Sequence, residues 1–117
     1  MLKIFIGSDH AGYPLKIALR EYLSKSGKYE VLDVGTDQKV SCHYPVFAHR
    51  ISQMIKPEDR AILVCGSGIG IGIAANKCNM PCATVYDEYT ASECGKHFNA
   101  MAIGGRVVSV ELACIMV

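Results

Sequence analysis

The sequence has no long hydrophobic run and no cluster of charges of one sign. Its longest apolar stretch, around Ile69 to Ala75, contains two glycines and is far shorter than the roughly 20 residues that a transmembrane helix needs. Twelve basic and eleven acidic residues give a formal net charge of +1, which argues against binding nucleic acid or a membrane through bulk charge. An anionic ligand held by a few local groups remains compatible with this composition.

The sequence also lacks a secretory signal pattern and an internal repeat. Met1 to Gly7 is too short for the apolar part of a signal peptide and Asp9 follows at once, so we expect a cytoplasmic protein. The 117 residues suit one domain over residues 1–117. A domain of this size buries a modest core, so self-association would add stability.

Six cysteines are present, but they form no C-x-x-C pair and no paired Cys or His motif that would complete a zinc site. They are Cys42, Cys65, Cys78, Cys82, Cys94 and Cys114. We therefore expect reduced thiols and no bound metal.

Short apolar segments alternate with amphipathic ones along the whole chain. The expected strands cover residues 2–7, 29–34, 61–64, 83–86 and 101–103, and the expected helices begin near residues 14, 45, 69, 89 and 110. This alternation predicts an α/β fold with three layers, α/β/α, around a five-stranded parallel sheet. We expect the Rossmann-like strand order 2-1-3-4-5, in which the order reverses between the first and third strands.

Two loops with unusual composition meet at that reversal point, where open α/β sheets bind their ligands. The loop SDHAG follows the first strand, and the loop CGSGIG follows the third. In the second loop, glycines let backbone amides converge and the next helix adds its positive end, so the loop forms a cradle for a phosphate or a developing oxyanion. The cradle matches neither the P-loop nor the dinucleotide-binding motif.

Several ionisable residues flank this cradle, and each has a plain structural alternative. Cys65 lies at a helix start, where a thiol loses its proton readily and acts as a nucleophile or a base, but free cysteines are often only buried. Asp9 and His10 are expected to face the same crevice; otherwise Asp9 caps a helix and His10 is solvated. His97 ends a helix that we expect to point at the crevice, or it merely terminates that helix. Arg106 alone resembles an ordinary surface arginine.

Five segments carry a resemblance to a known family over nearly the whole chain. They are KIFIGSDHAGYPLK (3–16), DVGT (33–36), YP (44–45), CGSGIGIGIAANK (65–77) and GGRVV (104–108). Together they resemble the family of ribose-5-phosphate isomerase B and galactose-6-phosphate isomerase. The resemblance implies an aldose–ketose isomerase of small sugar phosphates in the pentose phosphate pathway. It further implies a homodimer or a tetramer with sites built from two subunits, and no metal or organic cofactor.

The resemblance also implies a role for each residue of the site. Cys65 is the base that moves a proton between C2 and C1, and His97, assisted by Asp9, opens the furanose ring. The remaining roles are enediolate binding by the amides of Gly66, Gly68, Ile69 and Gly70, sugar contacts from Ser67, Tyr44 and Asn99, and phosphate binding by His10 and Arg106.

The chain departs from the family pattern in one stretch. The segment from His97 to Arg106 is shorter than in the family, and Asn99 stands in for the asparagine that usually follows the histidine directly. Two alternatives to a ribose 5-phosphate isomerase therefore remain. One is a phosphosugar-binding or regulatory module of the same fold, and the other is an isomerase of a hexose 6-phosphate.

Overall fold

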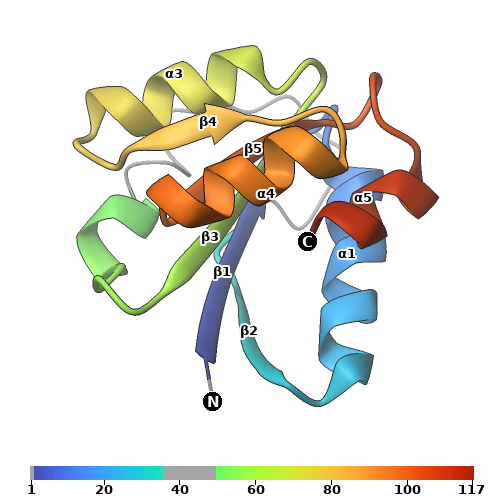
Figure 1. Ribbon diagram of the computed structural model, residues 1–117, viewed down its shortest axis with the longest axis horizontal. Coiled ribbons are helices and arrows are strands. Elements are labelled where there is room, and N and C mark those ends of the chain that lie inside the picture. Colours follow the sequence, from blue (N-terminus) through green and yellow to red (C-terminus); the bar gives the residue numbers. More distant parts are fainter. Residues whose placement is uncertain (1, 36–49) are drawn as a thin grey trace.

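The computed structural model describes residues 2–35 and 50–117, which form a parallel sheet between two layers of helices (Figure 1). The strands are β1 (Leu2–Ser8), β2 (Tyr29–Asp33), β3 (Arg60–Cys65), β4 (Cys82–Thr84) and β5 (Ala100–Gly104). The helices are α1 (Tyr13–Ser26), α3 (Ile69–Lys77), α4 (Glu88–His97) and α5 (Val110–Met116), and residues 50–54 are also helical. Within these ranges, no helix has the length and apolarity needed to span a bilayer.

The helix ends follow the expected local signals. Pro14 lies in the first turn of α1, and Gly27 ends this helix in the left-handed conformation, with φ of 71°. The Ser109 side chain accepts a hydrogen bond from the Leu112 amide, which confirms the predicted cap of α5. Asp87 caps α4 in the same way through the Thr90 amide.

The two faces of the sheet bury different residues of the same strands, because successive side chains of a strand point to opposite sides. Ile4 and Ile6 pack in the core beneath α1, α4 and α5, whereas Phe5 packs on the opposite face with α3 and Ile51. Both faces of the sheet are therefore covered by helices. This confirms the predicted three-layer α/β/α fold with a parallel sheet.

The strand order is β2-β1-β3-β5-β4, and the predicted order 2-1-3-4-5 is wrong in its last two places. β5 pairs with β3 along its whole length, and Ala100 and Ala102 are almost completely buried there. β4 has three residues and pairs only with β5, as suits a short edge strand. The reversal between β1 and β3 is unaffected, so the expected position of the site stands.

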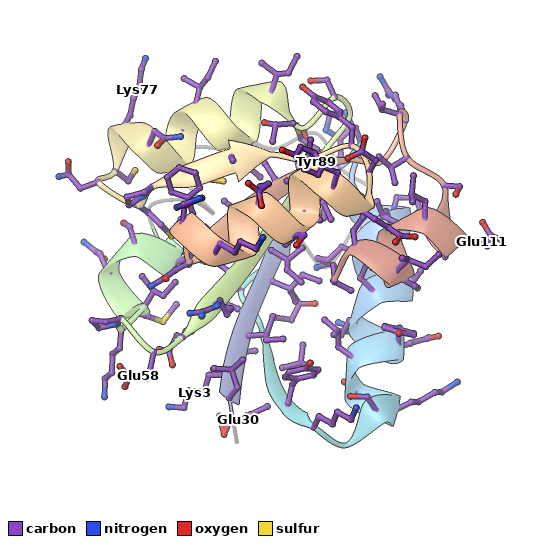
Figure 2. All side chains as sticks on the ribbon, viewed as in Figure 1. Lys3, Glu30, Glu58, Lys77, Tyr89 and Glu111 are labelled. Atoms are coloured by element: carbon purple, nitrogen blue, oxygen red, sulfur yellow. The ribbon has the colours of Figure 1, made fainter. Side chains whose placement is uncertain are left out.

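Charged side chains lie mainly on the outside of the molecule. Among the described residues Asp9, Asp59 and Lys16 are buried, and Lys16 is the most completely buried of the three. Figure 2 shows the labelled side chains of Lys3, Glu30, Glu58, Lys77 and Glu111 pointing outward. Lys16 on α1 is fully buried, and its ammonium lies 2.9 Å from Asp33 Oδ1 at the end of β2. Arg20, one turn further along α1, binds the other oxygen of this carboxylate at 2.6 Å.

This buried ion cluster makes the stability of the protein depend on pH. Burial raises the pKa of Asp33, but the Gly35 amide, Lys16 and Arg20 together outweigh it and hold this pKa below its ordinary value. The stabilisation is complete above the unfolded-state pKa of about 3.9, and it is lost as the pH falls through the lower folded-state pKa.

We expect Asp33→Asn to lower the free energy of unfolding at pH 7 by about 3 kcal/mol, because it removes a carboxylate from a buried ammonium. Urea unfolding at several pH values from 7 down to about 2 measures this, and the difference between the wild type and the variant should hold to about pH 4 and shrink below it. The control is Glu93→Gln, whose exposed ion pair with Lys96 should contribute almost nothing. A difference that stays constant with pH would contradict the assignment.

Candidate active site

An open cleft of about 550 Å³ lies at the carboxyl edge of the sheet, beside the ends of β1 and β3. It is the place where the reversal in strand order leads us to expect a ligand. The residues that line it are Asp9, His10, Ala11, Cys65, Gly66, Ser67, Gly70, Arg106 and Val107. The structure thus brings the loop after β1 and the loop after β3 together, as predicted from their positions in the sequence.

Cys65 is the last residue of β3 and is buried at the base of the cleft. The Gly68 amide donates a hydrogen bond to its sulfur at 3.1 Å, and the Ile69 amide donates to Ser67 Oγ at the same distance. Gly68 has a φ of 84°, a left-handed conformation that favours glycine. An amide that points at sulfur offers a hydrogen bond to the thiolate, which is the reactive form of cysteine.

The loop that follows β5 fixes the position of this cradle. The Gly105 amide donates to the Cys65 carbonyl at 2.7 Å, and the Arg106 amide donates to the Gly66 carbonyl at 3.0 Å. Because β3 and β5 pair up to Cys65 and Gly104, the loops that follow them leave the sheet side by side. The position of β5 next to β3, which the sequence did not predict, therefore brings Arg106 to the cleft.

The loop after β1 supplies a buried carboxylate and an exposed imidazole. Asp9 is 8% exposed, and its Oδ1 accepts a hydrogen bond from the Gly12 amide at 2.8 Å, directly before α1. Its own amide donates to the Val64 carbonyl on β3 at 3.2 Å. His10 is exposed at the mouth of the cleft. Asp9 thus lines the cleft, as expected. It does not cap α1, whose N-cap residue is Gly12 with no side-chain cap hydrogen bond, but it binds the amide of that residue.

Arg106 is the cation of the cleft. Its side chain lies against Gly66, where an added Cβ would lie 3.6 Å from Arg106 Cδ. Among residues 2–35 and 50–117, no carboxylate forms an ion pair with it. The guanidinium is therefore available to an anion that enters the cleft, as a phosphate group would.

The other described cysteines differ from Cys65 in their surroundings. Burial, together with the nearby Cys94, raises the pKa of Cys82 to about 12. Burial also raises the pKa of Cys94, whose sulfur donates to the Ala100 carbonyl. Thiols of this kind are inert at neutral pH. In the described part of the chain, no three His, Cys, Asp or Glu residues gather as a metal site would require.

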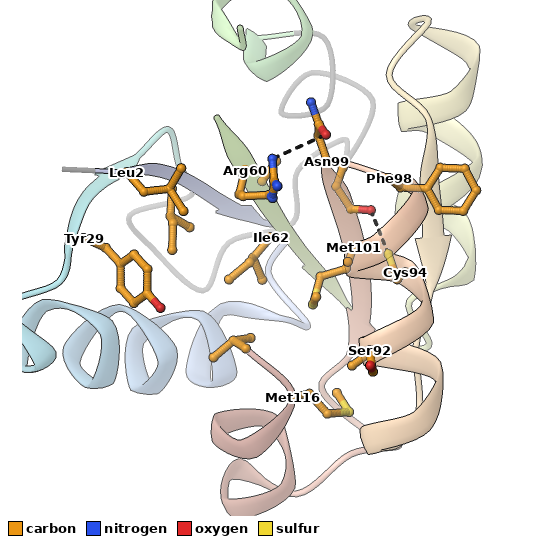
Figure 3. A pocket seen from close by; sticks show the side chains of 16 residues that line it. Leu2, Tyr29, Arg60, Ile62, Ser92, Cys94, Phe98, Asn99, Met101 and Met116 are labelled. Atoms are coloured by element: carbon orange, nitrogen blue, oxygen red, sulfur yellow. Dashed lines mark hydrogen bonds between the residues drawn. The ribbon is translucent and has the colours of Figure 1, made fainter. Parts of the chain in front are cut away.

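The structure does not bring His97 and Asn99 into the cleft of the same chain. Because α4 follows β4 and returns across the sheet, it ends at the amino edge, where His97 lines a separate cavity of about 320 Å³. Asn99 lies at the same edge, with its Oδ1 3.4 Å from Arg60, beside a third cavity of about 250 Å³ (Figure 3). β5 rises about 13 Å from Ala100, next to Asn99, to Gly104, which pairs with Cys65. The two ends of the sheet are thus separated by about this distance.

The expectation that the helix before His97 points at the crevice is therefore wrong for a single chain. Tyr44, the remaining predicted sugar contact, lies outside the described residues. Ala11 and Val107 line the cleft without having been predicted, because small and apolar residues in a loop carry no chemical signal.

Comparison with known proteins identifies the family. The family model of Ribose/Galactose Isomerase matches residues 4–117. Ribose-5-phosphate isomerase B of Escherichia coli (strain K12) is 39% identical over 122 residues, which cover 100% of this chain and 81% of that protein. A D-erythrulose-4-phosphate isomerase of Pectobacterium atrosepticum is 40% identical, over 97% of this chain and 78% of its own length.

The fold agrees with the same family. The structure of Clostridium thermocellum ribose-5-phosphate isomerase B matches with a TM-score of 0.92 and 42% sequence identity, over 98% of this chain and 80% of that one. The resemblance noted from the sequence motifs is thus confirmed by the family model, the relatives and the fold. The chain belongs to the ribose/galactose isomerase family.

Proposed function

We propose that this chain interconverts ribose 5-phosphate and ribulose 5-phosphate in the cytoplasm, through an enediolate and with Cys65 as the base. The observation that carries the proposal is the hydrogen bond from the Gly68 amide to Cys65 Sγ at the base of an open cleft. The base and the amides that would bind the oxyanion thus belong to one loop, with a phosphate-binding cation beside them.

The reaction needs a base and a stabilised oxyanion. The Cys65 thiolate takes the proton from C2 of the open-chain aldose, and the electron pair moves through the new C1–C2 double bond onto O1. A proton then passes from O2 to O1 while Cys65 returns its proton to C1, which yields the ketose. The amides of the cradle stabilise the negative oxygen, and each well-placed donor contributes about 3–4 kcal/mol to the transition state.

The substrate's chain length is tested directly with sugar phosphates of different size. One relative is named for a tetrose phosphate and another for a pentose phosphate, so the family model alone does not choose between them. We expect the highest kcat/KM with ribose 5-phosphate, measured against erythrulose 4-phosphate and galactose 6-phosphate in a buffer with a metal chelator. Binding of these compounds without turnover would instead support a phosphosugar-binding module.

The phosphate is held by His10 and Arg106 in this proposal. We expect Arg106→Ala to raise KM at least about tenfold with a smaller change in kcat, because a charge-assisted contact contributes about 1.5–3 kcal/mol. Initial rates over a range of ribose 5-phosphate concentrations measure both constants. Lys28→Ala, which removes an exposed cation away from the cleft, is the matched control. An unchanged KM would remove Arg106 from the phosphate site.

His97 enters the site from a second copy of the chain in this proposal. The support is its position at the opposite edge of the sheet from Cys65, together with the two-subunit sites that the family resemblance implies. As the group that opens the furanose ring, His97 should matter more for ribose 5-phosphate than for ribulose 5-phosphate. The proposed assembly is a homodimer, or a tetramer built from it.

We expect mixed dimers to regain activity that neither parent has. Cys65→Ala and His97→Asn should each be nearly inactive with ribose 5-phosphate when assayed alone. After mixing, subunit exchange places both intact residues in one of the two sites of each mixed dimer, so activity should return. If Cys65 and His97 acted within the same chain, every site would lack one of them and mixing would restore nothing.

A further inference from the structure

Thr84 contacts the cradle from behind, although it does not line the cleft. It is the last residue of the edge strand β4, and its side-chain hydroxyl donates a hydrogen bond to the Gly68 carbonyl at 2.9 Å. The same carbonyl also accepts the first hydrogen bond of α3, from the Gly72 amide, at 3.3 Å. The bond from Thr84 is thus the shorter of the two that hold this oxygen.

The carbonyl of Gly68 and the amide of Ile69 belong to one planar peptide group and point in opposite directions. A hydroxyl that holds the oxygen therefore directs the Ile69 N–H to the other side, where it lies 3.1 Å from Ser67 Oγ. The preceding amide, that of Gly68, points at Cys65 Sγ. Thr84 thus acts on the backbone that joins the two ordered amides of the cradle.

Two glycines of this chain make room for Thr84. A Cβ added at Gly68 would lie 3.0 Å from Thr84 Cγ2, and one added at Gly72 would lie 3.0 Å from Thr84 Oγ1. The start of α3 therefore approaches β4 closely enough for the methyl group of Thr84 to pack against Gly68 while its hydroxyl reaches the carbonyl. Both groups of the threonine are used, and each can be removed separately by substitution.

We propose that Thr84 is a positioning residue of the isomerase, whose hydroxyl orients the Gly68–Ile69 peptide so that the amide cradle faces the reacting oxygen. Thr84 touches no substrate and acts only through these amides. The proposal deepens the proposed function and rests on it for its kinetic consequence. The geometric part, the orientation of the peptide by the hydroxyl, can be measured without turnover.

The matched variants are Thr84→Val, which keeps the methyl group and loses the hydroxyl, and Thr84→Ser, which does the reverse. We expect Thr84→Val to lower kcat about tenfold with KM changed less than about twofold, because the enediolate charge exists only in the transition state and a misplaced donor stabilises it less. Thr84→Ser should keep kcat within about twofold of the wild type, because the hydroxyl is retained.

Thr90→Val is the control for the loss of a threonine hydroxyl elsewhere. The Thr90 hydroxyl accepts from the Tyr86 and Asp87 amides in the cap of α4, and Thr90 does not line the cleft. This variant should lower the melting temperature without lowering kcat. If all three variants lost kcat in proportion to the decrease in their melting temperature, Thr84 would act only through general stability. That result would overturn the proposal.

A second measurement tests the geometry whatever the substrate proves to be. In ¹⁵N–¹H NMR spectra, the amide signals of Gly68 and Ile69 should shift in Thr84→Val and stay near their wild-type positions in Thr84→Ser. Unshifted signals in Thr84→Val would overturn the positioning role even if the enzyme is active. A wild type without isomerase activity would refute the proposed function, and the shifts would still decide the role of Thr84.

Discussion

Cys65→Ala is expected to fold normally and to lose about 10²–10⁴-fold in kcat, the usual contribution of a general base. The alanine removes the sulfur that accepts the Gly68 amide, but it keeps β3 and its pairing with β5 intact. Because the thiolate acts only on the proton in transfer, KM should change little. Initial rates in both directions and a circular dichroism spectrum measure the two parts of this prediction.

Cys114→Ala is the matched control for this variant. Cys114 is a partly buried free cysteine on α5, away from the cleft, so its removal should leave kcat unchanged. A Cys65→Ala protein that keeps more than a tenth of the wild-type kcat would refute cysteine as the base. Another group of the cleft would then have to take the proton. The candidate is Asp9, the carboxylate among the residues that line the cleft.

The second large effect is expected from Gly104→Ala, at the end of β5. A Cβ at this position would lie 2.5 Å from both the carbonyl carbon and oxygen of Ser67, and 2.9 Å from the Gly66 carbonyl oxygen. These are backbone atoms of the cradle, so the cradle must move away from the sheet. We expect about a hundredfold loss of kcat, since small displacements of positioned groups are costly, and a loss of about 1–3 kcal/mol in unfolding free energy from overpacking.

Gly95→Ala provides the comparison for the same chemical change. Gly95 lies inside α4 with no atom within 4 Å of the added Cβ, so alanine should stabilise the helix by about 0.5–1 kcal/mol and leave kcat unchanged. Urea unfolding and initial rates on both variants give the result. If Gly104→Ala were as active as Gly95→Ala, close packing of the cradle against β5 would not matter for catalysis.

The sequence by itself determined the elements of the fold and one half of the site. Alternating apolar and amphipathic segments predicted the strands and helices of the α/β/α fold, since their periodicity is a local property. The loops that carry Asp9, His10 and Cys65 directly follow their strands, and the carboxyl ends of neighbouring parallel strands meet at one edge. Their grouping therefore followed from the sequence, while their chemical roles stay predictions.

Only the tertiary structure decided which distant segments lie side by side. The place of β5 between β3 and β4 depends on how its two faces pack, Ala100 and Ala102 in the core under α3 and Met101 and Ile103 in the core under the other helices, which no local pattern encodes. The same holds for the burial of Lys16 beside Asp33 and for the contact of Thr84 with Gly68. Such positions are set by contacts between segments, and the periodicity of a single segment contains no information about them.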